Sequence, residues 1–177
     1  LKDSLASLAN GVIIIFTKPF KKGDYVEING MDGLVQDIRL FNTKILTYSN
    51  EEIIVPNSEV LGSKLINYST MPLRRVVLAV PVPYASDIGE VRKIMLDCAS
   101  AHPCVVSSPA PSVVLDAFDS SALKLSVRVW TLNENYWTVN NELKENLFNA
   151  LREHGIEIPF DRLDVRLIGG DKEGGNA

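Results

Sequence analysis

The stretch Gly11–Gly33, GVIIIFTKPFKKGDYVEINGMDG, joins an apolar segment to a basic turn and then to a strand. The turn combines three lysines with an aromatic residue: Lys18, Phe20, Lys21 and Lys22. Pro19 cannot continue a helix, because it lacks an N–H and its ring clashes with the preceding turn. Lysine stems can lie on apolar surface while their ammonium groups reach lipid headgroups. The stretch predicts a helix ending near Pro19, which either leaves a membrane surface or packs as an amphipathic helix on its own domain.

Residues 1–16, upstream of the turn, have a helical pattern. Leu5, Leu8, Val12 and Ile15 recur at three- and four-residue steps and therefore share one face. Small residues lie between them, at Ala6, Ser7, Ala9 and Gly11. Small side chains permit the close approach of a neighbouring helix, and a glycine costs helix stability unless such packing requires it. We therefore expect a helix over 1–16 that packs closely on a neighbour.

Residues 24–68, downstream of the turn, have the pattern of short strands. Asn29-Gly30 is a two-residue hairpin signal, and Tyr48–Glu51 is a second turn between strands. In the segment Leu34–Leu40, the residues Leu34, Ile38 and Leu40 are expected on one face. Pro56 stops a strand, and Asn57 or Ser58 is expected to cap a short helical turn. Five strands in about 45 residues predict a small SH3- or Sm-like barrel over residues 17–70.

Residues 71–160 predict a second domain with mixed elements. Alternating valines and leucines indicate strands at 76–82, 112–118 and 123–130. Asp87 with Glu90 resembles a capping box for one helix, and a second helix runs from about Glu134 to a stop at Gly155. The order β-α-β-β-α is that of a split βαβ, ferredoxin-like sandwich, so the fold class is α+β. Residues 161–169 predict a final strand, and 170–177 predict a disordered tail.

Composition narrows the classes of function. The chain has 177 residues, a net charge of −4 and two cysteines, so nothing global directs it to nucleic acid or implies a disulfide framework. No window approaches the ~20 apolar residues that a membrane span needs. Because the first residue is Leu1 rather than methionine, we expect a piece of a longer chain.

No motif for enzymatic catalysis is present, and no enzyme activity or cofactor is expected. The sequence has no Gly-x-Ser-x-Gly, phosphate-binding glycine loop or dinucleotide fingerprint. Cys98-x-x-x-His102-x-Cys104 has metal-ligand residue types but no fourth ligand, so a packing role is favoured over a metal site. An Sm-like ring could bind RNA, yet its aromatics are scattered at Tyr25, Phe41, Tyr48 and Tyr68. A soluble RNA-binding ring and a regulatory or metal-binding module remain as alternatives.

Several short motifs resemble one known family. They are Ser4–Gly11 (SLASLANG), Phe16–Val26 (FTKPFKKGDYV), Gly33-x-Val35, Ile53–Ser58 (IIVPNS), Ile66–Ser69 (INYS), Val127–Trp130 (VRVW) and Gly155–Pro159 (GIEIP). Together they resemble the small-conductance mechanosensitive channels, the MscS-like family, over nearly the whole chain.

The resemblance implies a homoheptameric channel in the inner membrane of a bacterium or archaeon, with this region on the cytoplasmic side. Bilayer tension would open it to release ions and small osmolytes on hypo-osmotic shock. Its partners would be other copies of the chain and membrane lipids, with no nucleic acid. Residues 1–16 would be the end of the pore helix, and the β and αβ domains would form a hollow vestibule.

The resemblance also assigns roles to particular residues. The membrane interface would comprise Lys18, Phe20, Lys21 and Lys22. The gating contacts and hinge would comprise Asp3, Ser7, Gly11, Pro19, Pro56 and Asn57, with Asn57 beneath the helix near Ser7. One strand of an oligomeric barrel would be supplied by Leu163, Val165 and Leu167. Asp3 stands where many relatives have a kink glycine, so its effect on kinking is left open.

Overall fold

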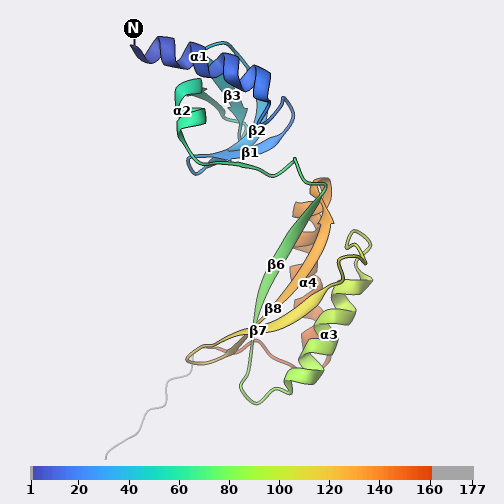
Figure 1. Ribbon diagram of the computed structural model, residues 1–177. Helices are drawn as coiled ribbons and strands as arrows, with labels where there is room; N and C mark the ends of the chain where they lie inside the picture. The colour runs from blue at the N-terminus through green and yellow to red at the C-terminus, as the bar shows by residue number, and fades with distance from the viewer. Residues whose placement is uncertain (1, 161–177) are drawn as a thin grey trace, which may run out of the picture. The chain divides into compact units, whose positions relative to one another are not determined.

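The computed structural model describes residues 2–160, which fall into two compact units (Figure 1). The first contains the residues up to Val76 together with Trp130–Val139, and the second contains Val77–Val129 together with the residues from Asn140 onward. The mixed α+β class is confirmed. The expected strand at 161–169, with Leu163, Val165 and Leu167, and the tail at 170–177 lie outside the described residues.

The first unit has a five-stranded antiparallel sheet and two helices. The sheet order is β4-β3-β2-β1-β5, and we call these strands with α2 the β domain. The elements are α1 (Lys2–Thr17), β1 (Tyr25–Ile28), β2 (Met31–Ile38), β3 (Asn42–Leu46), β4 (Glu52–Pro56), α2 (Asn57–Gly62) and β5 (Leu65–Asn67). The expected hairpin at Asn29-Gly30 is confirmed, since both residues have positive φ, 51° and 79°.

The face expected for Leu34 in β2 is wrong. Leu34 is exposed and its neighbour Val35 is buried. The register between β2 and β3 shifts between Val35 and Asp37, so one extra residue changes which side chains point inward. Beyond this irregularity Ile38 packs against the core, as expected, while Leu40 is exposed.

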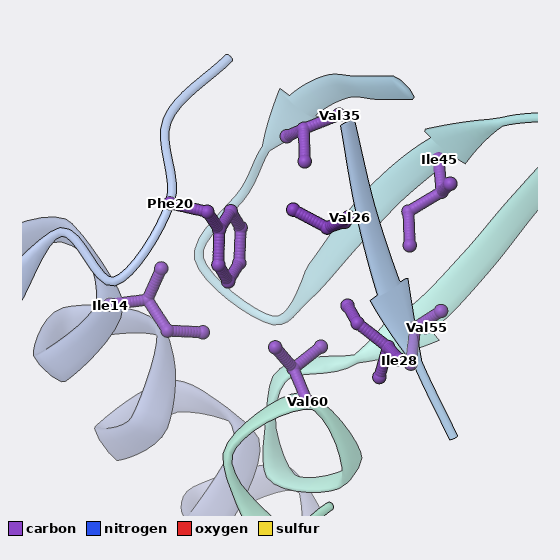
Figure 2. Packing of buried hydrophobic residues seen from close by; sticks show 8 residues of the cluster. All are labelled: Ile14, Phe20, Val26, Ile28, Val35, Ile45, Val55 and Val60. Carbon is purple, nitrogen blue, oxygen red and sulfur yellow. The ribbon is translucent and has the colours of Figure 1, made fainter. Parts of the chain in front are cut away.

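The core of the β domain takes in side chains from α1 and from the turn that follows it (Figure 2). Ile14 of α1 and Phe20 of the turn lie beside side chains from four strands and α2. The cluster consists of Ile14, Phe20, Val26, Ile28, Val35, Ile45, Val55 and Val60. Burial of this kind stabilises a fold by about 25 cal/mol per Å² of apolar surface, so α1 belongs energetically to the β domain.

The second unit contains most of the split βαβ arrangement. The elements from β6 to α4 belong to the second unit, except for the residues up to Val76 and Trp130–Val139. They are β6 (Leu73–Val82), α3 (Ile88–Ala101), β7 (Ser112–Phe118), β8 (Leu123–Leu132), a short 3-10 helix (Asn133–Asn135) and α4 (Tyr136–Glu153). The three-stranded sheet has the order β6-β8-β7, so β6 and β7, which α3 connects, lie on either side of β8. Figure 1 shows α3 and α4 running along this sheet.

The predicted helix boundaries of this domain hold for local reasons. The Asp87 carboxylate accepts hydrogen bonds from the backbone N–H groups of Gly89 and Glu90, which caps α3. Gly155 has a φ of 73° just beyond α4, and the Ile156 N–H donates to the Leu151 carbonyl at 2.9 Å. This is a Schellman-type end, in which glycine adopts the left-handed conformation at no steric cost.

Candidate functional site

Helix α1 docks on the β domain with its small residues inward. Ser7, Gly11 and Ile14 are buried at the helical spacing i, i+4, i+7, and α1 packs mainly against α2. Larger apolar residues of α1 point outward and are at least 40% exposed: Leu5, Val12, Ile13, Ile15 and Phe16. Ile14 apart, this is the reverse of an ordinary amphipathic helix, and the outer face of α1 is an exposed apolar surface.

Gly11 marks the point of closest approach. A Cβ atom at this position would lie 2.1 Å from the Leu40 carbonyl oxygen and 2.6 Å from Asn57 Nδ2. Only a glycine lets the helix backbone sit this close to the turn between β2 and β3. The expected neighbour for the small residues of α1 is therefore the β domain, through α2 and this turn.

The Asn57 side chain lies next to Gly11 in this contact and does not cap α2. Its Nδ2 donates to the carbonyl oxygens of Arg39 and Leu40 at 2.9 and 3.0 Å, and its Oδ1 accepts from Thr43 Oγ1 at 3.0 Å. The residue before α2 is Pro56, and no side chain caps the helix, so the expected cap by Asn57 or Ser58 is wrong. The Asn57 side-chain oxygen, which a cap would require as acceptor, accepts from Thr43 instead, and Asn57 is fully buried.

Ser58 makes the polar contact to α1. Its hydroxyl lies 3.0 Å from the hydroxyl of Ser7, while Asn57 Nδ2 lies next to Gly11. A single hydroxyl–hydroxyl bond contributes about 0.5–1.5 kcal/mol net, so this contact can be broken at modest cost. Asp3 is exposed in the first turn of α1, and its influence on a kink stays a prediction.

The basic turn divides into an exposed part and a buried part. Lys18, Lys21 and Lys22 are exposed, as an interface role requires. Phe20 is only 2% exposed and belongs to the core, so its expected place at the membrane interface is wrong. Helix α1 ends one residue earlier than Pro19 alone would demand, because Lys18 adopts the left-handed conformation with a φ of 48° while its N–H donates to the Ile14 carbonyl at 2.9 Å.

Two residues of the quoted motifs, to which the sequence analysis assigned no role, hold the segment after α1. Asp24 is buried, and its carboxylate accepts from the Lys21 N–H at 3.1 Å and from Asn67 Nδ2 at 2.9 Å. Asn67 Nδ2 also donates to the Pro19 carbonyl at 3.2 Å. These partners are more than 40 residues apart in sequence, which no local pattern can indicate.

Three of the four aromatic residues considered for base stacking pack on one another, namely Tyr25, Tyr48 and Tyr68, whereas Phe41 is 48% exposed. The Tyr25 ring lies 5.6 Å from the Tyr48 ring and 5.9 Å from the Tyr68 ring, and the Arg74 guanidinium covers Tyr68 at 4.1 Å. Burial and a hydrogen bond to Asp32 raise the pKa of Tyr25, while a hydrogen bond to Glu27 and burial raise the pKa of Tyr68. Phenols engaged in this way are unlike the free faces that stack bases.

The Cys98–His102–Cys104 segment is engaged in packing. His102 is buried, its Nε2 lies 3.1 Å from Glu142 Oε2, and its Nδ1 accepts from the Cys104 N–H at 3.2 Å. Both ring nitrogens are thus used. Within residues 2–160, no three histidine, cysteine, aspartate or glutamate side chains lie together in a way that could hold a metal ion.

We expect Cys98 to react slowly with alkylating reagents. Burial raises the pKa of its thiol, and the thiolate is the reactive form. At about pH 8 the thiol should be modified several-fold more slowly than that of an unstructured peptide, whose pKa is about 8.5. Time-resolved mass spectrometry after iodoacetamide treatment checks this, with urea-unfolded chain as the control. Equal rates in the two samples would contradict the burial of Cys98.

No helix in the described part of the chain is long and apolar enough to cross a membrane.

Comparisons with known proteins match both domains. Residues 3–70 match the family model described as mechanosensitive ion channel, beta-domain, and residues 76–158 match the model described as mechanosensitive ion channel MscS, C-terminal. Both domains therefore match domains that are found in mechanosensitive ion channels.

Individual relatives narrow the class to one family. The small-conductance mechanosensitive channel of Edwardsiella ictaluri is 34% identical over 94% of this chain, and that of Helicobacter pylori is 36% identical over 94%. The crystal structure of Helicobacter pylori MscS in its closed state aligns with a TM-score of 0.91 and 36% identity, covering 96% of this chain and 68% of that one. The chain belongs to the MscS family. It spans 58% and 61% of the lengths of the two curated relatives.

Proposed function

We propose that this chain is the cytoplasmic vestibule region of a tension-gated ion channel, and that α1 couples the membrane to the β domain. The observation that carries the proposal is the reversed packing of α1. Its small residues seat it on the β domain, while its large apolar side chains face outward beside three exposed lysines. Such a helix can contact lipid or a membrane helix on one side and a folded domain on the other.

A tension gate needs no catalytic residues. It needs two packed states of different membrane area, whose balance the bilayer can bias. The contact at Ser7 and Gly11 supplies one of these states, because it is close-packed yet held by a single hydroxyl bond. We propose that α1 is docked on the β domain when the channel is closed. Pro56 and Asn57 then transmit movement of α1 into the β domain. The permeating species would be ions and small osmolytes, released on hypo-osmotic shock.

The proposal includes an assembly and a location. The full protein would form a homoheptamer in the inner membrane of a bacterium or archaeon, with this region in the cytoplasm. Leu163, Val165 and Leu167, which lie outside the described residues, would line a barrel of strands from several copies. Support for assembly and location comes from family membership and from the outer face of α1.

Patch-clamp recording of the full-length protein that contains this chain tests the proposal. In membranes lacking other such channels, graded suction should open it. Replacing Lys18, Lys21 and Lys22 with glutamine should raise the suction required, because each lysine contributes about 1 kcal/mol of attraction to an anionic surface. Lys64→Gln, an exposed lysine elsewhere in the β domain, is the matched control and should not change it.

Either element of the proposal can fail separately. Suction-dependent openings that ignore the triple lysine change would reject the headgroup role of the turn and keep the channel. Silence from a chain shown to be present in the membrane would reject tension gating.

A further inference from the structure

The segment after α1 is bound to the β domain through one side-chain amide. Asn67 Nδ2 donates to the Pro19 carbonyl at 3.2 Å and to Asp24 Oδ2 at 2.9 Å. The same Asp24 oxygen accepts from the Lys21 N–H at 3.1 Å. Pro19 and Lys21, on either side of the buried Phe20, are therefore both fixed by polar contacts.

Asn67 is itself held rigidly. It is the last residue of β5, where it pairs with Val26 of β1. Its Oδ1 accepts from the backbone N–H groups of Ser69 and Thr70 at 2.9 and 3.2 Å. Both ends of the amide are thus engaged, and Asn67 acts as a bracket between the sheet and the segment Pro19–Lys21. The conformational entropy of the Asn67 side chain has therefore already been lost on folding.

The two ends of α1 are attached unequally. Toward its N-terminus the helix rests on small residues and one Ser7–Ser58 hydroxyl contact. At its C-terminus the chain is held by the Asn67–Asp24 bracket and by Phe20 in the core. Between helix and bracket stands Lys18, a non-glycine residue in the left-handed conformation, which is an uncommon and strained backbone state.

We propose that Asn67 is a positioning residue for gating, because it holds the fixed side of the pivot on which α1 moves. The inference rests on the proposed function. It corrects the expected hinge at Pro19, since the Pro19 carbonyl is tied to the sheet, and it confines rotation of α1 to the backbone around Thr17 and Lys18. When the membrane moves α1, the movement then reaches the β domain, because the segment Pro19–Lys21 between them is held in place.

The test separates this role from simple stabilisation by three variants of the full chain. Asn67→Ala removes the whole bracket. The double change Asp24→Asn with Asn67→Asp exchanges amide and carboxylate at constant charge. It keeps a 24–67 hydrogen bond and the acceptors for Ser69 and Thr70, but it leaves the Pro19 carbonyl facing an acceptor. Because one Asp24 oxygen accepts from both Asn67 and Lys21, it also leaves the Lys21 N–H facing an amide NH2. Ser69→Ala, which removes the acceptor of the Tyr25 N–H, is the matched control outside the segment.

Suction thresholds and hydrogen exchange give the two readouts. Asn67→Ala should open only at higher suction and should exchange the amides of residues 18–24 faster. The double variant should keep both the raised threshold and the faster exchange of the Lys21 amide, although its residue 67 again accepts from Ser69 and Thr70. Ser69→Ala should have the wild-type threshold. A wild-type threshold in the double variant, or an equal shift in Ser69→Ala, would overturn the inference, because the bracket would then act through stability alone.

Failure of the proposed function is distinguishable from failure of this inference. A wild-type chain that never opens under suction rejects the function. The inference is then decided by exchange, and unchanged exchange of residues 18–24 in Asn67→Ala overturns it. Faster exchange of residues 18–24 in that variant and in the double variant, with wild-type exchange of these residues in Ser69→Ala, supports the bracket.

Discussion

Replacing Gly11 with alanine is expected to push α1 away from the β domain and to lower the free energy of unfolding by about 1–3 kcal/mol, as overpacking of a close contact does. The new Cβ would lie 2.1 Å from the Leu40 carbonyl oxygen, and that carbonyl is held in place by Asn57 at 3.0 Å. Helix propensity acts in the opposite direction, because alanine is favoured over glycine by about 1 kcal/mol in a helix interior. A lower free energy of unfolding for Gly11→Ala would therefore indicate that the close contact exists, and a higher one would indicate that it does not.

Gly62→Ala is the control for this prediction. Gly62 is also a helical glycine, at the end of α2, but no heavy atom lies within 4 Å of the position a Cβ would take. Urea unfolding followed by far-ultraviolet circular dichroism should therefore show a loss for Gly11→Ala and little change for Gly62→Ala. Stabilisation by Gly11→Ala would contradict the docking of α1.

The same substitution has a consequence for gating. The docked arrangement of this chain aligns with a relative described as closed. If the channel gates as proposed, weakening the docked state should lower the suction needed to open it. Weakening the hydrogen bonds of Asn67 should raise the suction needed for opening, because the segment Pro19–Lys21 would then absorb part of the movement of α1. Opposite shifts from two changes at the two ends of one helix are difficult to explain by general destabilisation.

Local patterns were sufficient to predict most elements of the fold. The Asn29-Gly30 turn, the Asp87 cap and the Gly155 stop each depend on backbone conformations that a short stretch of sequence controls. The alternation in β6 and β8 likewise matches their buried faces. In β2 the pattern failed, because an extra residue in one strand reverses the face and leaves no periodic signal.

The orientation of α1 could not be predicted from its composition. Large apolar residues normally mark the buried face of a helix, yet here five of them lie outward, while the buried residues are Ser7, Gly11 and Ile14. The rule assumes that water surrounds the chain, whereas under the proposed function the outer face of α1 meets lipid or a membrane helix. The roles of Asn57 and Asn67 were likewise hidden, because their partners are backbone carbonyls brought near by the fold.

Replacing Phe20 with alanine should be the most damaging single change in the first unit. Phe20 is 2% exposed and lies among Ile14, Val26 and Val60 (Figure 2). Phenylalanine-to-alanine changes in a core cost about 3–5 kcal/mol, because buried surface is lost and a cavity remains. Since an ordinary domain is stable by about 5–15 kcal/mol, this variant should be close to unfolding in the urea titration.

Phe16→Ala provides the matched comparison, since the same side chain is removed four residues earlier. Phe16 is 82% exposed, so its loss should change the free energy of unfolding by no more than about 0.5 kcal/mol. With anionic lipid vesicles the ranking should reverse, because Phe16 lies on the outer face of α1 and Phe20 does not. Vesicle co-sedimentation should therefore fall for Phe16→Ala and not for Phe20→Ala at temperatures where both are folded. A lipid-binding loss confined to Phe20→Ala would restore the membrane role first expected for Phe20 and would mean that α1 docks by its other face.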